Sequence, residues 1–363
     1  MNILFADLER EWRGGQSQAL LALRGLRDAG HRVELLAAQN SPLAERSAAA
    51  GIPVAEVPRS ALRISGAAKI RGLLRGGGFD LLHLNEPHAL TAAWLAGAHQ
   101  RLPLLLSRRI GFPLQKNLVS RARYRAVTRF LPNSKAVAES LLRCGIGPDR
   151  ISVVNEGVEI PPLATSRQRA DARQHWGIRD GQFLFGCVSV LVPEKGQRHL
   201  IEALPLLRKI HPAARLLLAG DGPCRAELTT LTKKLGQQDA VLMPGFVQDV
   251  ASVYTALDAF VFPSEFEGLG TALQTAMALA IPAISTARGA LGEVVTNNQT
   301  ALVVEPVACE FAAEMKLLIE DSALRRRLGD AGRREIQLRF SAERMVENTI
   351  AVYEEVLRDV RKE

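Results

Sequence analysis

The feature that most constrains the fold of this chain is a regular alternation of short apolar runs with helix-like segments. Such alternation predicts a parallel sheet whose two faces are covered by helices. In the first half, the expected strands are Ile3–Ala6, Val33–Ala37, Val54–Val57, Leu81–Leu84, Leu104–Leu106 and Phe130–Leu131. The expected helices run from a Gly14-Gly15 turn to Asp28, after Pro42, around Ala67–Leu74, at Ala89–Ala98 and after Asn133-Ser134.

Pro161-Pro162 and the polar stretch Thr165–Asp171 interrupt this rhythm, so we expect a linker there. Beyond it, strands are expected at Leu184–Val188, Arg215–Ala219, Val241–Met243, Ala259–Phe262, Pro282–Ser285 and Ala301–Val304, with helices between them and to the C-terminus. The sequence thus predicts an α/β protein with two doubly wound domains, residues 1–162 and 163–340, facing each other across a cleft. An amphipathic packing helix is expected at 341–363. Ligands of such sheets bind at the carboxyl ends of the strands.

Composition excludes several other classes of protein. Apolar residues make up 47% and charged residues 23% of the 363 residues, which is typical of a globular chain and excludes disorder throughout. Four widely spaced cysteines without a CxxC pair form neither a zinc motif nor a disulfide framework, so a reducing compartment is expected. No apolar run reaches the roughly 20 residues that span a bilayer. Because a strand follows the first residues directly, we expect no signal peptide and a cytoplasmic location.

The net charge of +8 is concentrated in one region. No acidic residue occurs between Glu86 and Glu139, whereas basic residues are frequent there: Arg101, Arg108, Arg109, Lys116, Arg121, Arg123, Arg125, Arg129 and Lys135. This stretch mixes apolar and cationic side chains, which suits an anionic membrane surface, a phosphorylated saccharide acceptor, or simply a solvated face. Nucleic acid is not favoured, because no recognition motif or aromatic platform accompanies the charge.

Three loops combine glycine or lysine with the start of a helix. Gly14-Gly15 follows the first strand and suits a close approach to phosphate or a sugar, although a plain turn explains it equally. Lys195, in "VPEKG", follows a strand and places a compact cation where a diphosphate could bind, or else lies in a solvated turn. No GxGxxG motif follows any strand, which argues against hydride transfer.

The third loop is the most informative. In "PSEFEGLGT", from Pro263 to Thr271, small residues at the helix start expose the backbone N–H groups of Leu269, Gly270 and Thr271 to phosphate oxygens. Glu267 beside such an anion site most simply binds a sugar hydroxyl, or it only caps the helix.

The first half offers two further candidates at strand ends. His83 in "DLLHLNE" is either a hydrogen-bonded structural residue or a catalytic one that points into the cleft. Arg108-Arg109 ends a neighbouring strand, and a guanidinium pair there favours phosphate or carboxylate.

The run "FPSEFEGLGTALQTAMALAIPAISTARGALGEVV", which begins at Phe262, resembles the donor-site signature of the family-4 retaining glycosyltransferases of GT-B fold. Further segments resemble the family in order: "GGQSQALLALRGLRDAGHRVELL", "LPNSKAVAESLL", "VVNEGVEI", "VPEKG", "LLLAGDGP" and "VLMPGFVQDVASVYTALDAFVFPS". The resemblance covers nearly the whole chain and is most specific in the second half.

The resemblance implies transfer of a sugar from a nucleotide-sugar to a saccharide or lipid-linked acceptor, with retention and without a metal or other cofactor. Cell-envelope polysaccharide or lipopolysaccharide synthesis, at the inner face of the membrane, is the implied setting. It also implies that the last helix returns to the first domain. The residues implied for the site are Lys195, Glu267 and Arg109 for catalysis, and Gly14, Gly15, Phe246, Val247, Gly268, Leu269, Gly270, Thr271 and Thr275 for donor binding. His83 joins the catalytic candidates from its position at a strand end.

Five positions depart from the family pattern. Ser189-Val190 stands where many members have Gly-Arg, and Thr275 stands where a second glutamate is common. Arg109 and Asn85 stand where the family often has histidines. These departures keep two rivals open: a non-catalytic nucleotide-sugar-binding protein, and a nucleotide-sugar epimerase or hydrolase of the same fold.

Overall fold

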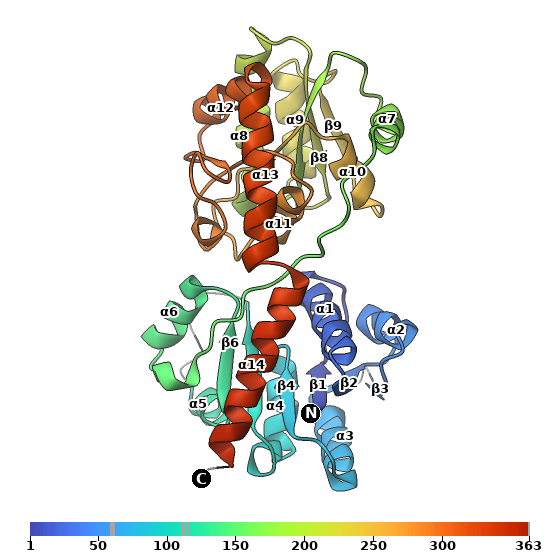
Figure 1. Ribbon diagram of the computed structural model, residues 1–363, viewed down its shortest axis with the longest axis vertical. Coiled ribbons are helices and arrows are strands. Elements are labelled where there is room, and N and C mark those ends of the chain that lie inside the picture. The colour runs from blue at the N-terminus through green and yellow to red at the C-terminus, as the bar shows by residue number, and fades with distance from the viewer. Residues whose placement is uncertain (59–61, 110–113, 115–116, 362–363) are drawn as a thin grey trace. The chain divides into compact units, whose positions relative to one another are not determined.

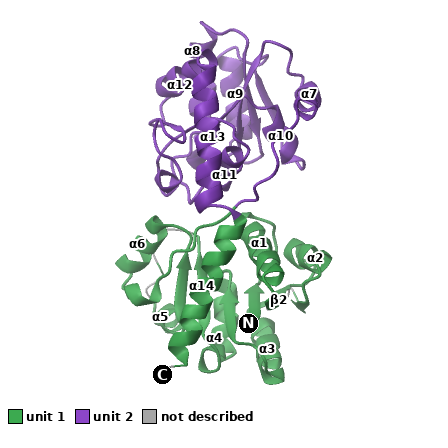
Figure 2. Cartoon of the chain, viewed as in Figure 1, with its two compact units in different colours: residues 1–157, 342–363 green, residues 158–341 purple. Residues whose placement is uncertain are grey.

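The computed structural model describes residues 1–58, 62–109, 114 and 117–361 and divides into two compact units (Figures 1 and 2). The first unit joins residues 1–157 to 342–363, and the second comprises residues 158–341. Each unit contains one six-stranded parallel sheet flanked by helices, which confirms the predicted doubly wound α/β fold.

The first sheet has the strand order β3-β2-β1-β4-β5-β6. Its strands are β1 (Asn2–Asp7), β2 (Arg32–Ala38), β3 (Val54–Val57), β4 (Leu81–Leu84), β5 (Leu104–Arg108) and β6 (Arg129–Pro132). Its helices are α1 (Gly14–Asp28), α2 (Pro42–Ala49), α3 (Leu62–Gly76), α4 (Pro87–Leu95), α5 (Leu118–Arg125), α6 (Lys135–Arg143) and α14 (Ala342–Val360), with 3₁₀ turns at Ala98–Gln100 and Pro148–Arg150.

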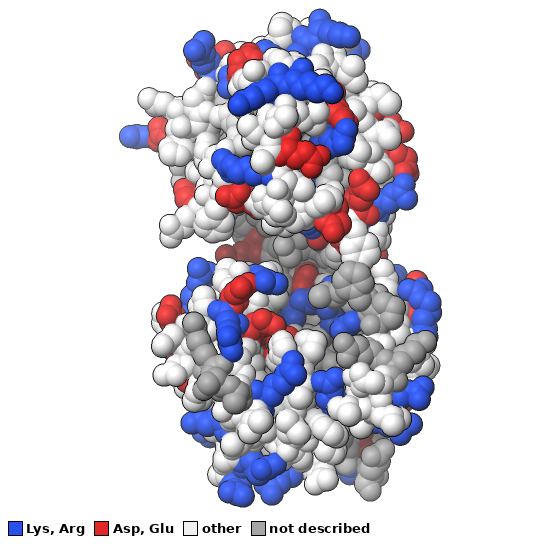
Figure 3. Space-filling model, turned by 180° about the vertical axis from the view of Figure 1, so that it is seen from behind, with Lys and Arg blue, Asp and Glu red and all other residues white. Residues whose placement is uncertain are grey.

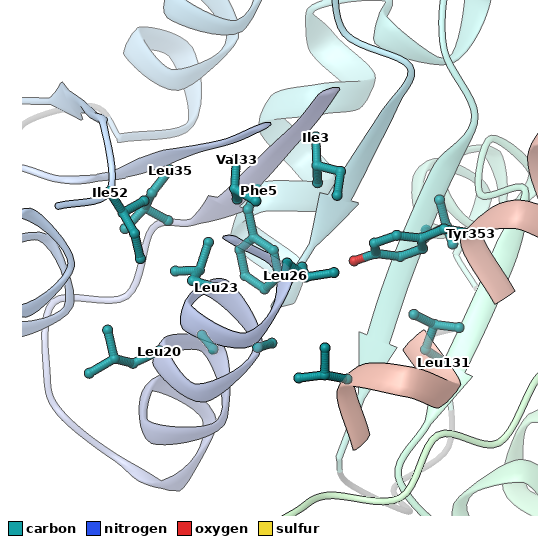
Figure 4. Packing of buried hydrophobic residues seen from close by; sticks show 14 of the residues in the cluster. Ile3, Phe5, Leu20, Leu23, Leu26, Val33, Leu35, Ile52, Leu131 and Tyr353 are labelled. Atoms are coloured by element: carbon teal, nitrogen blue, oxygen red, sulfur yellow. The ribbon is translucent and has the colours of Figure 1, made fainter. Parts of the chain in front are cut away.

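The helix α14 completes the core of the first unit, as the sequence resemblance predicted. Tyr353 and Val356 are buried among residues of β1, β2 and α1, including Phe5 and Leu23 (Figure 4). Gly25 of α1 makes this packing close, because a Cβ there would lie 2.3 Å from a methyl group of Val346. Burying one aromatic ring removes about 150–250 Å² from water, so α14 supplies a substantial part of this core.

The second sheet has the order β12-β11-β10-β7-β8-β9. Its strands are β7 (Phe183–Val188), β8 (Ala214–Ala219), β9 (Val241–Gly245), β10 (Ala259–Phe262), β11 (Ala283–Ser285) and β12 (Leu302–Val303). Its helices are α7 (Ser166–His175), α8 (Gln197–Arg208), α9 (Arg225–Lys234), α10 (Val250–Ala256), α11 (Thr271–Ala278), α12 (Ala308–Glu320) and α13 (Ser322–Arg339), with 3₁₀ turns at Pro193–Lys195 and Leu291–Glu293.

Both sheets reverse their strand order at one point, and that point locates the sites. In the first unit the reversal lies between β1 and β4, and in the second between β7 and β10. Loops that leave two such neighbouring parallel strands diverge to opposite sides and create a crevice at the carboxyl edge. The loops after β7 and β10, together with the helix starts that follow β1 and β10, carry most of the predicted site residues.

Two local predictions were wrong. The polar stretch Thr165–Asp171, expected as a linker, lies largely in α7, which Thr165 and Gln168 start with a reciprocal capping box. Gly14-Gly15, expected as a turn, forms the first two residues of α1. Pro161-Pro162 lies in the second unit, a few residues beyond its start at Val158.

Candidate functional site

Two loops of the second unit meet at its switch point. The loop after β7 contains the 3₁₀ turn Pro193–Lys195, and the loop after β10 leads to α11. The amide of Glu265 donates to the carbonyl of Glu194 at 2.8 Å, and the Ser264 hydroxyl donates to the same carbonyl at 3.3 Å. These bonds hold the two loops together although about 70 residues separate them.

Gly196 is required where the two loops cross. Its φ of 63° lies in the left-handed region, and a Cβ there would lie 2.3 Å from the carbonyl oxygen of Pro263. Any side chain would therefore meet both a strained backbone conformation and a fixed oxygen. The glycine of "VPEKG" thus allows the β7 loop to pack directly on the β10 loop.

Lys195 and Glu267 face each other across these loops. The ammonium donates to Oε2 of Glu267, and the two side chains are only 19% and 16% exposed. The Ser264 hydroxyl oxygen lies 3.3 Å from the same carboxylate oxygen, which is an alternative acceptor to the carbonyl of Glu194 for its one hydrogen, and the ammonium lies 6.0 Å from the centre of the Phe262 ring. A cation and a carboxylate are thereby presented side by side at the edge of the sheet.

The N-terminus of α11 lies next to this pair in the sequence. Gly270 precedes the helix with a φ of 64° and supplies no side-chain cap. Among the described residues, none of the amides of Leu269, Gly270 and Thr271 donates to a protein acceptor. An uncapped helix start of this kind attracts anions, because its N–H groups and the helix dipole both carry positive partial charge.

The remaining predicted donor residues surround the same edge. Thr275, one turn into α11, donates its hydroxyl to the carbonyl of Thr271 at 2.8 Å. Phe246 and Val247 follow β9, and the Phe246 side chain is 81% exposed. Val190, after β7, is also exposed. Each of these residues follows a strand or opens a helix at the carboxyl edge of the second sheet.

The first unit has its own polar cluster at the switch point. Asp7 at the end of β1 accepts from Nδ2 of Asn85 at 2.6 Å and from Nε2 of Gln16 at 3.0 Å. Arg109, just beyond β5, donates through Nη1 to the carbonyl of Asn85 at 3.1 Å. A Cβ on Gly15 would lie 3.9 Å from Cδ of Arg109, so the guanidinium stem packs beside the first turn of α1.

His83 occupies an enclosed position. Its Nδ1 contacts the hydroxyl of Tyr353, its Nε2 contacts the hydroxyl of Ser107 at 2.8 Å, and its ring stacks on Phe5 with a centroid distance of 4.3 Å. Burial, and secondarily the charge of Arg109, lowers the pKa of His83 to about 3. The His83 side chain is almost fully buried, and it lines a small pocket together with Ser107, Arg109 and Glu156.

Sequence reasoning assigned no role to three further residues of the first unit. Glu156 forms an ion pair with Arg109, with Oε1 and Nε 2.8 Å apart, and Tyr353 reaches His83 from α14. Glu86 accepts bonds from the amides of Leu8, His88 and Ala89 and so caps α4. Only the cap had a visible signal, since a carboxylate directly precedes Pro87 at the helix start.

Glu86 also belongs to a group that could be mistaken for a metal site. Ligand atoms of Glu9, Glu86 and His88 gather within 4.8 Å of one another. However, Arg63 donates to Nδ1 of His88 from both Nε and Nη2, at 3.1 and 2.9 Å. The imidazole proton then lies on Nε2, the atom that faces Glu9 at 3.8 Å, so Nε2 is not available as a ligand in this arrangement.

The basic stretch of the first half forms α5 and its surroundings. Leu118 and Val119 at the start of α5 are 82% and 59% exposed. Ile110–Pro113, Gln115 and Lys116 lie outside the described residues. Within the described part of the chain, no helix is long and apolar enough to cross a membrane.

Known proteins match this chain in sequence and in structure. The profile of the glycosyl transferases group 1 matches residues 168–335, and that of glycosyltransferase family 4 matches residues 12–160. The chain is 32% identical to a GDP-mannose-dependent monoacylated alpha-(1-6)-phosphatidylinositol monomannoside mannosyltransferase of Corynebacterium glutamicum, over 51% of this chain and 50% of that protein. It is 28% identical to the N-acetyl-alpha-D-glucosaminyl L-malate synthase of Bacillus anthracis, over 53% of this chain and 51% of that protein.

The chain therefore spans about half the length of the curated relatives it matches. Among solved structures, Anabaena HepE in complex with UDP-glucose superposes with a TM-score of 0.84 at 22% identity, over 98% of this chain and 100% of that chain. The two family profiles together cover both units, and the solved structure has the same two-domain architecture. The chain belongs to the family-4 glycosyltransferases and has their GT-B fold.

Proposed function

We propose that this protein transfers a sugar from a nucleotide-sugar donor to a saccharide or lipid-linked acceptor, with retention of the anomeric configuration. The observation that carries the proposal is the pairing of Lys195 with Glu267 beside the uncapped start of α11. A nucleotide-sugar offers two kinds of group to such a site: a diphosphate for the cation and the amides, and sugar hydroxyls for the carboxylate. Membership of the family and the UDP-glucose bound to Anabaena HepE support this assignment.

Lys195 and the amides of Leu269, Gly270 and Thr271 would bind the donor diphosphate. The leaving nucleoside diphosphate gains negative charge as the glycosidic bond breaks, and fixed donors stabilise that charge without reorganising. A single preorganised donor of this type contributes about 2.7–4 kcal/mol to the transition state. Glu267 would accept from sugar hydroxyls and orient the anomeric carbon. Phe246 and Val247 would meet the base through their backbone.

The bond changes need no protein nucleophile. The acceptor hydroxyl oxygen bonds to the anomeric carbon, while the bond from that carbon to the phosphate oxygen breaks. The acceptor proton passes to a phosphate oxygen of the leaving group on the same face, which retains the configuration. No metal ion is required in this scheme, because Lys195 and the helix start neutralise the phosphate charge. Gly14, Gly15 and Arg109 of the first unit would bind an anionic group of the substrates.

Thr275 weakens donor binding relative to a glutamate at that position. A lost hydrogen bond to a charged group costs about 1.5–3 kcal/mol, which corresponds to roughly 10- to 150-fold in affinity. The Thr275 hydroxyl already donates to Thr271, so it has only its lone pairs left for a nucleotide ribose. We therefore expect donor dissociation constants at the weak end of the family range.

A donor screen followed by a turnover assay tests the proposal. Thermal shift is measured with UDP-, GDP- and ADP-sugars, because a ligand that binds the folded state stabilises it by RT ln(1 + [L]/Kd). The sugar that stabilises the protein is then supplied with saccharide and lipid-linked acceptors, and the product anomer is identified by NMR. Transfer with retention is expected. An inverted product, or no stabilisation by any nucleotide-sugar, would contradict the proposal.

Two rivals follow from Val190 and Thr275, which replace residues that many members use for the donor. A binding protein would show stabilisation without turnover under every acceptor condition. An epimerase or hydrolase would consume the nucleotide-sugar at the full rate without any acceptor, and analysis of the products would identify it.

We also propose that the first unit contacts an anionic membrane surface where lipid-linked acceptors lie, at the cytoplasmic face. Basic and acidic residues balance in the second unit, so the first unit carries the whole net charge of +8. Figure 3 shows a face of the first unit on which basic side chains far outnumber acidic ones. Leu118 and Val119 add apolar contact beside these cations, as a surface helix on a membrane does. The lipid substrate in the name of the mannosyltransferase relative supports this setting, which suits cell-envelope or lipopolysaccharide synthesis.

Vesicle flotation tests the membrane contact. The protein should float with vesicles that contain phosphatidylglycerol, lose that binding at high salt, and bind several-fold less when Leu118 is replaced by Glu. Equal binding to neutral vesicles, or an unchanged L118E variant, would favour a phosphorylated saccharide acceptor or a solvated face instead.

A further inference from the structure

We propose that Glu156 is a positioning residue that holds the guanidinium of Arg109 in the orientation needed to meet an anionic group of the substrates. This inference rests on the role proposed above for Arg109 and goes beyond it, because it assigns a function to a carboxylate to which the sequence analysis gave no role. Four contacts within the first unit carry the argument.

The first contact places the guanidinium between a carboxylate and a carbonyl. Nη1 donates to the carbonyl of Asn85 at 3.1 Å, and Nε lies 2.8 Å from Oε1 of Glu156 in an ion pair that lacks hydrogen-bond geometry. The Arg109 and Glu156 side chains are only 21% and 11% exposed, so water competes little with the pair. Among the described residues, Nη2 has no protein partner, and it is the edge of the guanidinium left to meet a ligand.

The second contact places that guanidinium beside the start of α1. Atoms Cδ and Nη1 of Arg109 would lie 3.9 and 4.0 Å from a Cβ on Gly15. Gly15 also accepts at its carbonyl from Nδ2 of Asn85 at 3.3 Å. The cation and the first amides of α1 therefore form one positively charged corner, although the residues come from different strand ends.

The third contact concerns Asn85, which binds the Arg109 guanidinium together with Glu156. Nδ2 of Asn85 donates to the buried carboxylate of Asp7 at 2.6 Å, and Gln16 of α1 donates to the same carboxylate oxygen at 3.0 Å. Asn85 therefore cannot turn without breaking a charge-assisted bond. The amide of Asn85 also donates to the carbonyl of Ala6 at 2.9 Å, which anchors the backbone whose carbonyl receives Nη1.

The fourth contact fixes the backbone that carries Glu156. Nδ2 of Asn155 donates to the carbonyl of Asn133 at 2.9 Å. Gln18 of α1 forms two bonds with the backbone of Gly157, donating to its carbonyl at 2.9 Å and accepting from its amide at 3.1 Å. The carboxylate thus lies on a segment held on both sides, which suits a residue whose purpose is to orient another.

The negative charge of Glu156 and its role in orienting Arg109 predict different effects when the carboxylate is removed, and this makes the inference testable. By charge alone, a carboxylate beside an anion site repels the ligand, so removing it should tighten binding. By position, removing it frees the guanidinium to adopt other rotamers and lowers the rate of a step that needs one orientation. Glu156→Gln should therefore lower kcat while leaving the Kd for inorganic pyrophosphate unchanged or tighter.

The experiment is a double-mutant cycle on the full chain, comparing the wild type with R109A, E156Q and R109A/E156Q. Turnover is measured with the nucleotide-sugar selected by thermal shift, pyrophosphate affinity by calorimetry, and stability by thermal unfolding. Glu159→Gln is the matched control, because Glu159 is an exposed glutamate three positions away. We expect kcat to fall roughly 10-fold or more in E156Q, further in R109A, and no further in the double variant, because the proposed effect of Glu156 on turnover passes through Arg109.

Each other outcome counts against the inference. A kcat for E156Q within twofold of the wild type, or losses that multiply in the double variant, would overturn it while the transferase proposal stands. Weaker pyrophosphate binding together with a large fall in melting temperature for E156Q would show a purely structural ion pair. Wild-type turnover by R109A removes the basis for the idea, and a wild-type chain without any turnover contradicts the proposed function and this inference together.

Discussion

Lys195 donates to Glu267, which lies 72 positions later in the chain, and the contact joins the loop after β7 to the loop after β10. When no substrate is bound, each of the two residues balances the charge of the other. A diphosphate can replace the carboxylate beside Lys195, and a sugar hydroxyl can replace the ammonium beside Glu267. The pair therefore keeps two charged groups satisfied at a half-buried position and still leaves both ready for a nucleotide-sugar.

Replacing Lys195 with Ala should reduce kcat by about 100- to 1,000-fold, because one preorganised donor to the leaving diphosphate is lost. The folded state should persist, since the Ser264 hydroxyl can still donate to Glu267. Steady-state kinetics and thermal unfolding measure the two effects. Lys209→Ala, which removes an exposed lysine at the end of α8, is the control and should behave as wild type. Near-normal turnover by K195A would exclude the assigned role.

Replacing Glu267 with Gln should weaken binding of the sugar part of the donor without weakening binding of the nucleotide part. Without the carboxylate, Lys195 is no longer neutralised by a protein partner, so the bare nucleoside diphosphate should bind as tightly as before or more tightly. The intact donor loses charge-assisted bonds to its hydroxyls, each worth about 1.5–3 kcal/mol, and kcat/KM should fall at least 10-fold. Calorimetry with both ligands tests the split, and a parallel loss for both ligands would show that Glu267 does not distinguish the sugar.

Replacing Gly196 with Ala should disrupt the contact between the two loops. The added Cβ would meet the carbonyl of Pro263 and would also adopt a left-handed conformation that costs about 1–2 kcal/mol in an L-residue. We expect lower thermal stability and weaker donor binding together. Gly72→Ala is the matched control, because Gly72 lies in α3 with open space around it, and the exchange should stabilise the helix by up to about 1 kcal/mol. Equal melting temperatures for G196A and wild type would refute the crossing geometry.

Glu86 should make the protein less stable as pH rises. Burial, and secondarily the charge of Asp7, raises the pKa of Glu86 to about 8 in the folded state, against 4.5 for an ordinary glutamate. The folded state then holds a proton that the unfolded state releases, so this contribution is complete below about pH 4.5 and is lost as pH rises through 8. Across this interval the free energy of unfolding should fall by up to about 1.4 kcal/mol per pH unit.

Denaturant unfolding between pH 5 and 9 measures that slope. Glu86→Gln should flatten it, whereas Glu45→Gln, at an exposed position in α2, should leave it unchanged. An E86Q variant with the wild-type slope would show that Glu86 is already ionised in the folded protein.

His83 should act in the opposite direction at lower pH. Its folded pKa of about 3 lies below the ordinary value of 6.5, so the unfolded state binds the proton first and stability falls as pH drops from 6.5 towards 3. Tyr353→Phe leaves a buried imidazole nitrogen without its partner and should cost about 1–3 kcal/mol at neutral pH. NMR titration of the His83 ring checks the pKa, and a midpoint near 6.5 would contradict this prediction.

Much of the fold could be predicted because its signals are local. Apolar runs marked the strands, and β10 at Ala259–Phe262 has the bounds that the sequence indicated. The start of α11 was visible because glycine at a helix start has a direct geometric meaning. By contrast, α7 was missed because its face is almost entirely polar, although the capping box of Thr165 and Gln168 marks its start.

The parts of the site that could not be predicted depend on contacts between distant segments. Tyr353 reaches His83 across 270 positions, and nothing near either residue indicates the other. The ion pair between Arg109 and Glu156 likewise needs the register of β5 beside β6 before the two side chains meet. Hydrophobic periodicity predicts on which face of a helix or strand a side chain lies. Which distant side chain it contacts depends on which strands become neighbours in the sheet.

The return of α14 to the first unit imposes an order on biosynthesis. Residues 158–341 are contiguous, so the donor-side unit holds all its own elements once translation has passed Ser341. The core of the first unit is complete only after Tyr353 and Val356 have been synthesised. Until then, the hydrophobic face of α1 stays exposed to chaperones and to neighbouring nascent chains. The first unit is thus begun first and completed last. A premature stop after residue 341 would leave the second unit with all its elements and the first unit without α14.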